Sequence, residues 1–252
     1  MGHKLEVLFT PAEFLALPQQ DLSQTICVAF DVFRATSAMI TALANDAAAV
    51  IPVNGIADAL AVRGREPEVL LAGERDGLRI HSALTGGIDF DLGNSPREFT
   101  KEKVAGKTIV MTTTNGTQAL RACARARAVL IASFLNLQAT TDFLKQHRPE
   151  SLLLVCSGTF DQVAFEDVLA AGALCDLLWS DYAEAEMADS ALMARKLFQL
   201  ARPNLLATAS RSRNGRRLLS IPELRDDVPF CLRRDVFGFA ATLQSDGKVR
   251  MA

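Results

Sequence analysis

The segment Val28–Ser37, with the sequence VAFDVFRATS, determines the fold class predicted for this chain. Around it, the apolar run Ile26–Asp31 is typical of a buried strand that ends on an acid. The following run, Ala35–Ala44, has its apolar residues at helical spacing and predicts a helix. A strand that leads directly into a helix is the repeating unit of α/β proteins.

Strand-type and helix-type runs alternate through much of the remaining sequence. The expected strands are Leu5–Thr10, Ile26–Asp31, Ala49–Val53, Glu68–Ala72, Lys107–Met111, Ala128–Ala132 and Leu152–Cys156. The expected helices are Ala35–Ala44, Gly55–Arg63, Thr117–Ala124, Asn136–Gln146 and Phe165–Leu178. This alternation predicts an α/β fold with a mostly parallel sheet and helices on both faces.

Two regions depart from the alternation. The stretch Glu74–Lys107 is rich in glycine and predicts a long loop, and such loops inside compact domains are usually functional. From Asp189 onward the chain predicts a helical part that ends in an antiparallel pair, Phe237–Leu243 with Lys248–Met251. We expect residues 1–252 to form a single catalytic unit, with a possible sub-domain boundary near residues 187–190.

Composition limits the classes of function. The net charge of −2 gives no basic excess for binding nucleic acid, and no apolar run reaches the ~20 residues that span a bilayer. The sequence begins without the apolar segment of a signal peptide. Five scattered cysteines predict reduced, buried thiols. We therefore expect a soluble cytoplasmic protein that binds neither nucleic acid nor membrane.

Four segments share one layout, in which an apolar strand runs into small polar residues. They are Val28–Ser37, Val69–Arg75 (VLLAGER), Ile109–Thr117 (IVMTTTNGT) and Leu153–Thr159 (LLVCSGT). Ligands of open α/β sheets bind beyond the carboxyl ends of the strands. Asp31, Glu74, Asn115 and Ser157 are therefore expected to converge.

The polar residues of these turns suit a phosphate. Helix N-termini offer free N–H groups and a partial positive charge, and small polar residues let the backbone approach an anion. The candidate phosphate ligands are Ser37, Thr114, Asn115, Gly116, Thr117, Ser157 and Gly158. The alternative is that each turn holds only ordinary helix caps.

The acids indicate a hard cation. A carboxylate at the end of an apolar strand is costly unless it is paired or bound to a metal, and Mg²⁺ prefers one or two carboxylates with phosphate oxygens and water. Asp31, Glu74, Glu166 and Asp167 are the candidate ligands. Asp31 could instead cap its helix, and Glu166 and Asp167 could simply favour a helix dipole. Arg34 could pair with Asp31 or clamp a phosphate.

Several other phosphatase designs do not fit the residues. A cysteine phosphatase needs an arginine six positions after its cysteine, where Cys156 is followed by Gln162 and Cys27 by Phe33. The triplet Arg-His-Gly of histidine phosphatases does not occur. Asp89–Gly93 has two acids but is a poor match to an aspartyl-nucleophile motif. The P-loop and the Gly-x-Ser-x-Gly elbow are also absent from the sequence.

Taken together, the motifs resemble the 2-phosphosulfolactate phosphatase family of coenzyme M biosynthesis. The matching segments are Asp31–Ser37, Ala72–Arg75, Phe90–Pro96, Thr113–Thr117, Cys156–Gly158, Glu166–Asp167 and Ala171–Gly172, with Ser210, Gly215 and Leu218 further on. The resemblance implies Mg²⁺-dependent hydrolysis of a phosphate ester on a sulfonated three-carbon acid. It also implies a fold particular to this family.

On this resemblance, Asp31, Arg34 and Glu74 are expected to be catalytic, with water or Asp31 as the nucleophile. Backbone N–H groups at 114–117 and 157–159 are expected to hold phosphate oxygens. Asn94 and Ser95 could contact the ligand, or Pro96 after them could simply start a helix at Arg97–Lys103. The carboxylate and sulfonate of the substrate need cations. Arg75 is the first candidate, ahead of Arg79 and the basic run Arg211, Arg213, Arg216 and Arg217. A homo-oligomer is possible.

Two other functions are compatible with the motifs. The same chemistry could act on another small phosphorylated carboxylic acid. Alternatively, the chain could bind a phosphorylated ligand without turning it over.

Overall fold

A computed structural model describes residues 4–114, 116–182 and 186–252. The strands are β1 (Lys4–Leu8), β2 (Thr25–Phe30), β3 (Ala49–Pro52), β4 (Leu70–Arg75), β5 (Leu78–Arg79), β6 (Thr108–Thr112), β7 (Ala128–Ala132), β8 (Ser151–Cys156), β9 (Glu186–Met187), β10 (Ala241–Leu243) and β11 (Val249–Met251). They form one sheet in the order β5-β4-β6-β3-β11-β10-β7-β2-β8-β1-β9.

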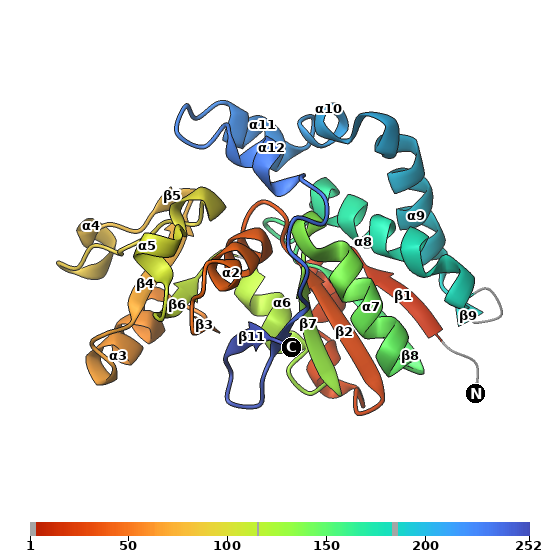
Figure 1. Cartoon of the computed structure of the whole chain (residues 1–252), viewed down its shortest axis with the longest axis horizontal. Helices are drawn as coiled ribbons and strands as arrows, with labels where there is room; N and C mark the ends of the chain where they lie inside the picture. Colours follow the sequence, from red (N-terminus) through yellow and green to blue (C-terminus); the bar gives the residue numbers. More distant parts are fainter. Residues whose placement is uncertain (1–3, 115, 183–185) are drawn as a thin grey trace.

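Along the chain, most helices connect one strand to the next, and the others follow one another in the last quarter (Figure 1). The α-helices are α1 (Pro11–Phe14), α2 (Ala35–Ala44), α3 (Ile56–Arg65), α4 (Ser82–Thr85), α5 (Lys101–Val104), α6 (Gly116–Ala122), α7 (Leu137–His147), α8 (Phe165–Leu178), α9 (Asp189–Ala201), α10 (Leu205–Ala209), α11 (Arg213–Leu219) and α12 (Asp227–Cys231). The 3₁₀ turns are η1 (Leu17–Gln19), η2 (Pro96–Glu98), η3 (Phe134–Asn136), η4 (Trp179–Tyr182) and η5 (Arg202–Asn204).

The sheet consists of two parallel groups joined by the C-terminal hairpin. The strands β7, β2, β8, β1 and β9 pair in parallel, as do β4, β6 and β3. Between the groups, β10 pairs antiparallel with β7, β11 with β10, and β11 with β3 through Val249 and Val50. Because three antiparallel pairings separate the groups, the groups run in opposite directions along the sheet.

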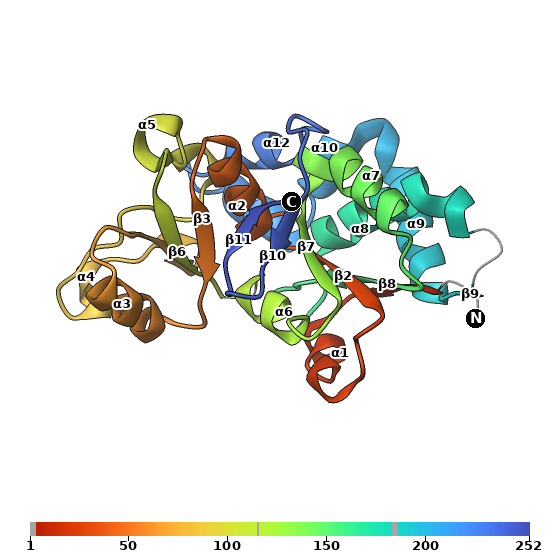
Figure 2. The same ribbon diagram turned by 60° about the horizontal axis from the view of Figure 1, so that its bottom comes forward.

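Sheet twist brings the ends of the two groups together. Five steps in the strand order separate β2 from β6, and at about 20–25° a step the twist accumulates to roughly 100° or more. Accordingly, β3 and β6 lie at a large angle to β2 and β8 (Figure 2). The segments that leave β2, β4, β6 and β8 can therefore reach a common region.

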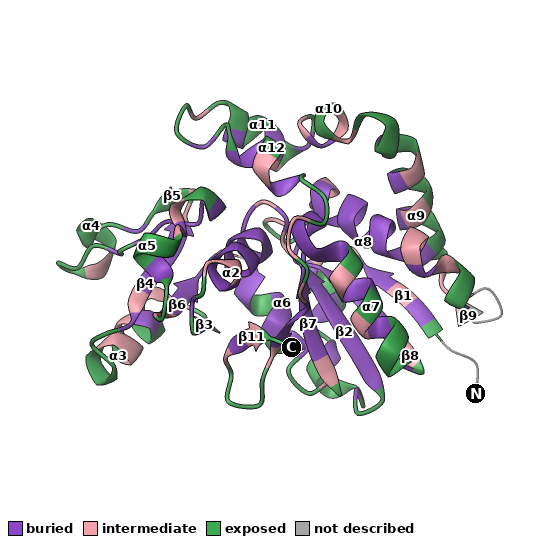
Figure 3. Cartoon of the chain, viewed as in Figure 1, coloured by how far each residue is buried: buried purple, intermediate pink, exposed green. Residues whose placement is uncertain are grey.

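Alternating side chains of β2 build a core on each face of the sheet. Ile26, Val28 and Phe30 belong to a cluster with apolar residues of α7, α8 and α9. Cys27 and Ala29 belong to a second cluster with residues of α1, α2 and α6. Since both faces are covered, β2 needs an unbroken apolar sequence rather than an alternating one. Figure 3 shows β2 and α8 buried, while α3 and α4 are largely exposed.

The predicted α/β fold with a mostly parallel sheet is confirmed, as are the C-terminal hairpin and the helical part from Asp189. The strands do not all end at one edge of the sheet, because the two groups run in opposite directions. The fourth strand was also predicted to end too early: it extends to Arg75, so Glu74 lies inside β4. The stretch Glu74–Lys107 holds several short elements rather than one continuous loop.

Two further predictions concern the cysteines and the membrane. All five cysteines are free and buried, as predicted. In the part of the chain that the structure describes, none of the helices combines the length and apolar character that crossing a bilayer requires.

Candidate active site

A pocket lies where the segments that follow β2, β6 and β8 meet the β4–β5 hairpin and α11. The described residues that line it are Asp31, Phe33, Arg34, Glu74, Asp76, Gly77, Asn94, Thr113, Thr114, Gly158, Thr159, Phe160, Asn214, Arg217 and Leu218. Its wall therefore comes from both parallel groups and from the C-terminal helical part. Folding of most of the chain is needed to assemble it.

Asp31 is half-buried in this pocket, one residue beyond the end of β2. Its Oδ1 accepts a hydrogen bond from the N–H of Ala35 at 3.1 Å, and its own N–H donates to Thr36 Oγ1 at 3.1 Å. The pKa of Asp31 is raised to about 7, first by burial and then by the neighbouring carboxylates of Glu74 and Glu166, although the Ala35 hydrogen bond opposes the shift. Asp31 therefore lies close enough to two other carboxylates for them to disfavour its charged form.

The first residue of α6 lies directly against Asp31. A Cβ atom added to Gly116 would lie 2.6 Å from Asp31 Oδ2 and 2.7 Å from Ala35 Cβ. Only glycine allows this approach, because real Cβ atoms do not come that close to other atoms. The contact brings the end of β6 to the end of β2, as the sequence predicted for these two segments.

Glu74 organises the neighbouring turns. Its Oε1 accepts from the N–H and the hydroxyl of Thr114 at 2.9 and 2.8 Å, and its Oε2 accepts from the N–H of Gly77 at 2.7 Å. The side chain is buried. Both of its oxygens are therefore occupied by groups of the protein, and they hold the turn after β6 against the β4–β5 hairpin.

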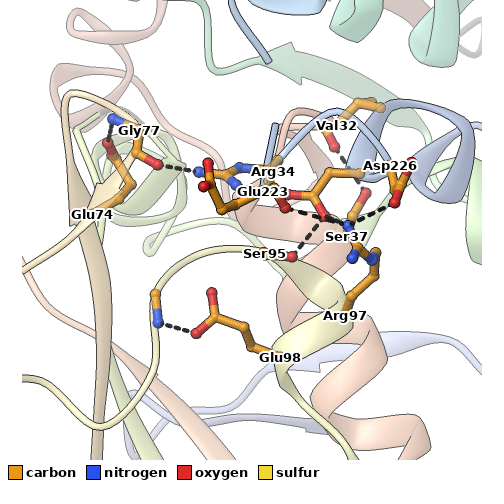
Figure 4. A network of polar contacts seen from close by, with 12 residues as sticks. Val32, Arg34, Ser37, Glu74, Gly77, Ser95, Arg97, Glu98, Glu223 and Asp226 are labelled. Atoms are coloured by element: carbon orange, nitrogen blue, oxygen red, sulfur yellow. Dashed lines mark hydrogen bonds and ion pairs between the residues drawn. The ribbon is translucent and has the colours of Figure 1, made fainter. Parts of the chain in front are cut away.

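Arg34 is fixed by a buried ion pair. Its Nη1 donates to Asp227 Oδ2 at 2.7 Å, with the two side chains 3% and 0% exposed, and its Nη2 donates to Gly77 O at 2.6 Å. Ser95 donates to the other oxygen of Asp227 at 2.6 Å. Figure 4 shows Arg34 reaching toward Gly77, with Ser95 and Arg97 on its other side.

Glu166 and Asp167 lie behind Asp31, at the start of α8. Both oxygens of Asp167 accept from backbone, from Val32 N–H at 2.8 Å and from Gly158 N–H at 3.3 Å. Glu166 Oε1 accepts from Asn214 Nδ2 at 2.6 Å. Burial raises the pKa of both acids, and Asp31 and Glu166 raise that of Asp167 further.

Several buried polar atoms at the site have no hydrogen-bond partner among the described residues. They are Asn94 Oδ1, Thr113 Oγ1, Thr117 Oγ1, Ser157 Oγ and Glu166 Oε2. Buried polar groups are ordinarily hydrogen-bonded, since an unsatisfied group costs about 1–3 kcal/mol. Their concentration here indicates a region built to bind polar groups that are not part of the chain.

Most of the predicted residues lie in the pocket or directly behind it. Asp31, Arg34, Glu74, Asn94, Thr114 and Gly158 line the pocket together. Thr117, Ser157, Glu166 and Asp167 are buried behind it, and Gly116 touches Asp31. Asn115 lies outside the described residues.

Ser37, Ser95 and Arg75 bond to the protein itself and are not among the lining residues. Ser37 donates to Val32 O at 2.9 Å, and Ser95 donates to Asp227. Arg75 donates to Glu74 O at 2.6 Å and to Thr112 Oγ1 at 3.2 Å. Their predicted contacts with a substrate remain predictions.

The expectation that backbone N–H groups at 114–117 and 157–159 hold phosphate oxygens stays a prediction. At four positions the N–H donates within the free protein. The N–H of Thr114 donates to Glu74, and that of Ser157 donates to Phe30 O at 2.8 Å. The N–H of Gly158 donates to Asp167, and that of Thr159 donates to Gln162 O at 2.8 Å.

Sequence reasoning missed Asp76, Gly77, Asn214 and Asp227, and it ranked Arg217 below Arg75. The turn at Asp76-Gly77 was predictable from the sequence, since Asp-Gly is a preferred two-residue hairpin turn. Both residues have positive φ, at 56° and 79°, as that turn requires. No sequence pattern indicated a role for Asp227, because an acid at the start of a short helix is usually solvated.

The four predicted metal ligands do not form a preformed cage. Among the residues that the structure describes, no three His, Cys, Asp or Glu side chains are placed so as to hold a metal ion. Glu74 and Asp167 accept hydrogen bonds at both oxygens, whereas Glu166 keeps one buried oxygen without a partner. Asp31 and Glu166 are therefore the acids best placed to bind a cation.

The fold and the pocket define an α/β protein with an acidic, oxygen-rich site at strand ends. Comparison with known families gives its affiliation. The model of the family described as 2-phosphosulpholactate phosphatase matches residues 13–246. This chain belongs to that family, as the motifs implied.

Named relatives agree with this assignment. A probable 2-phosphosulfolactate phosphatase of Thermotoga petrophila is 41% identical over 216 residues, which cover 86% of this chain and 88% of the relative. The corresponding protein of Thermotoga maritima is 40% identical over 83% of this chain and 85% of its own length. A probable 2-phosphosulfolactate phosphatase of a Synechococcus species is 39% identical, with 82% of this chain and 84% of the relative covered.

Proposed function

We propose that this protein is a phosphoric monoester hydrolase that converts 2-phospho-3-sulfolactate into 3-sulfolactate and phosphate. The family and its named relatives supply the reaction. The observation that carries the proposal in this chain is Asp31, an acid with a raised pKa in the pocket where the family's motifs meet. Perturbed acids in such pockets are typical of catalytic sites.

The charge balance of the pocket supports a Mg²⁺ cofactor. Three carboxylates, Asp31, Glu74 and Asp76, line it beside the two guanidinium groups of Arg34 and Arg217, a formal balance of −1 among the described lining residues. The substrate carries a phosphate, a carboxylate and a sulfonate. A site of this balance would repel such an anion unless a cation entered with it.

The donor set also fits Mg²⁺. The described lining residues include no His or Cys, and oxygen ligands with substrate phosphate and water suit a hard cation that needs only one or two carboxylates. Asp31 and Glu166 would hold it, because Asp31 faces the pocket and Glu166 has an unpartnered oxygen. When bound, Mg²⁺ supplies positive charge against the phosphate oxygens.

The residues of the chain then act by position and charge. Arg34 presents a guanidinium that is held in one orientation by Asp227 and Gly77, so it needs no reorganisation to stabilise negative charge. Thr113 and Asn94 offer unpartnered polar atoms to the substrate. The nucleophile that attacks phosphorus is either water or Asp31 itself. A phosphorylated Asp31 trapped by acid quench would identify the second route.

Phosphate release from a panel of esters tests the proposal. The panel contains 2-phospho-3-sulfolactate, other phosphorylated small acids and a simple alkyl phosphate, each with Mg²⁺ and with excess EDTA. We expect fast, EDTA-sensitive release from 2-phospho-3-sulfolactate. Release mainly from another ester would keep the chemistry and replace the substrate, and no release from any ester would favour a protein that only binds a phosphorylated ligand.

A further inference from the structure

Two guanidinium groups flank the Asp76-Gly77 turn at the edge of the pocket. A Cβ atom built on Gly77 would lie 3.8 Å from Arg217 Nε and 4.0 Å from Arg34 Nη2, so both side chains lie beside this turn. Each arginine donates to one carbonyl of the turn, Arg34 to Gly77 O and Arg217 to Asp76 O. The two cations therefore lie at the same end of the pocket.

The inner cation is fixed in place. Arg34 is buried and pairs with the fully buried Asp227, and this pair holds its guanidinium in one orientation. Breaking this pair would leave a buried charge without a partner, which is strongly unfavourable. Arg34 therefore cannot change partners when a ligand arrives.

The outer cation donates to Asp76 O but is only weakly paired with a carboxylate. The Arg217 side chain is 42% exposed, and its nearest carboxylate, Asp76 Oδ1, lies 3.8 Å away on a side chain that is 80% exposed. Ion pairs between exposed side chains contribute little, because water and salt screen them. Arg217 can therefore exchange Asp76 for an anionic group in the pocket that it lines.

We propose that Arg217 is the residue that recognises the acidic group of the substrate beyond the ester phosphate, and so selects esters that carry a second acid. The assignment rests on the proposed function. Arginine suits the task, since its planar fork can bind two oxygens of a carboxylate or a sulfonate at once. Asp76 holds the side chain at the pocket edge until the substrate binds.

The other arginines near the site form hydrogen bonds or ion pairs with other groups of the protein. Arg34 and Arg217 are the cationic members of the described pocket lining. Arg75 donates to Glu74 O and Thr112 Oγ1 from within β4. Arg213 donates to Gln162 Oε1 at 2.7 Å and to Thr159 O at 2.8 Å. Arg217 is thus favoured over Arg75, the first candidate from the sequence.

The test compares Arg217→Gln with Arg216→Gln, a matched control that removes the same charge from the next residue of α11. Arg216 is exposed and does not line the pocket. Steady-state kinetics would use 2-phospho-3-sulfolactate, 2-phospholactate, which lacks the sulfonate, 2-phosphooxyethanesulfonate, which lacks the carboxylate, and ethyl phosphate, which lacks both. Arg217→Lys keeps the positive charge but not the planar guanidinium, so it would show whether charge alone preserves part of kcat/KM.

We expect Arg217→Gln to lower kcat/KM for 2-phospho-3-sulfolactate by about 10- to 100-fold, mainly through KM, as loss of a charge-assisted hydrogen bond predicts. The value for ethyl phosphate should stay within about threefold, and Arg216→Gln should match wild type for every ester. If Arg217→Gln does not slow hydrolysis of 2-phospholactate, Arg217 binds the sulfonate. If it does not slow hydrolysis of 2-phosphooxyethanesulfonate, Arg217 binds the carboxylate. An equal loss on all four esters would show that Arg217 only supports the turn, and no loss would also overturn the proposal.

A binding measurement separates this inference from the proposed function. Calorimetric titration with 3-sulfolactate needs no turnover, so it reports on Arg217 even if wild type hydrolyses none of the esters. Binding that is weakened by Arg217→Gln but not by Arg216→Gln would support the inference while the reaction fails. If wild type neither binds 3-sulfolactate nor hydrolyses the esters, both proposals are overturned.

Discussion

At the scale of single residues, the protonation of Asp31 links the site to the stability of the fold. Its pKa is raised from 3.8 to about 7 in the folded protein. The folded state therefore holds a proton that the unfolded chain has already released between these values, so this group lowers stability as pH rises from 3.8 to 7. At about 1.4 kcal/mol per unit the limit is roughly 4 kcal/mol, less for a side chain in contact with solvent.

Replacing Asp31 with Asn should remove this penalty. We expect Asp31→Asn to stabilise the metal-free protein at pH 8 by about 1–4 kcal/mol, and by less at pH 5, where the wild-type carboxyl is still protonated. Urea denaturation in EDTA at the two pH values measures the difference. A variant that is less stable than wild type at pH 8 would contradict the raised pKa.

The buried pair of Arg34 and Asp227 gives a second prediction. Asp227→Asn removes the negative partner of a cation that is 3% exposed, and such losses cost about 3–5 kcal/mol. The neighbouring Asp226 is 67% exposed, so Asp226→Asn should change the free energy of unfolding by no more than about 0.5 kcal/mol. Similar values for the two variants in urea denaturation would show that the pair is not structural.

The predictability of the site differs from residue to residue. Asp31 was accessible from the sequence, because a carboxylate at the end of an apolar strand needs a partner. Asp227 and Arg217 were not, since each is one of several charged residues in a helical segment. Only the tertiary fold distinguishes the buried Asp227 from the exposed Asp226 beside it.

At the scale of elements, the start of α6 must approach α2 without a side chain. Gly116→Ala would place its Cβ within 2.7 Å of Asp31 Oδ2 and Ala35 Cβ, so the turn or Asp31 must shift. We expect at least a tenfold loss of phosphate release, since misplacement by about 1 Å can cost 100-fold. Steady-state kinetics of the variant tests this, and wild-type turnover would show that Asp31 need not be held in place.

Gly64, in α3, serves as the contrasting position. A Cβ atom there meets nothing within 4 Å, and the residue lies inside a helix. Gly64→Ala should therefore stabilise the protein by about 0.5–1 kcal/mol, because alanine favours helices over glycine, and should leave activity unchanged. Thermal unfolding measures the effect, and a lower melting temperature would contradict the open surroundings of Gly64.

Apolar elements were predicted closely whatever their length, and the strand Ala128–Ala132 has the predicted limits. The helix Phe165–Leu178 has the predicted limits. The end of β4 was misplaced because Gly73 reads as a break, whereas here it continues the strand with φ of 155° and its position packs against Thr112 O. Such a close approach depends on the neighbouring strand, which local sequence does not show.

At the scale of the whole molecule, the C-terminal hairpin joins the two parallel groups. Val249 is fully buried and pairs with Val50, while Met251 at the end of the same strand is 44% exposed. Val249→Asp would bury an unpaired charge and should cost about 3 kcal/mol or more, whereas Met251→Asp should cost about 0.5 kcal/mol or less. Equal stability of the two variants in urea would show that the hairpin does not join the groups.

The order of the strands in the sheet could be predicted only in part from the sequence. The strand–helix alternation correctly predicted a mostly parallel sheet, and the hairpin pattern predicted the antiparallel pair. Nothing local indicated that β10 and β11 would enter the middle of the sheet and reverse one parallel group. That insertion depends on contacts with Val50 and Leu130, some two hundred and one hundred residues away along the chain.

The central claim is that Asp31 is the acid on which hydrolysis depends. Its most direct test is phosphate release from 2-phospho-3-sulfolactate by wild type and Asp31→Asn, with Mg²⁺ and with EDTA. We expect wild type to release phosphate only with Mg²⁺, and folded Asp31→Asn to be slower by about 1,000-fold or more, as for loss of a principal catalytic group. A folded Asp31→Asn protein with near-normal turnover would contradict the claim.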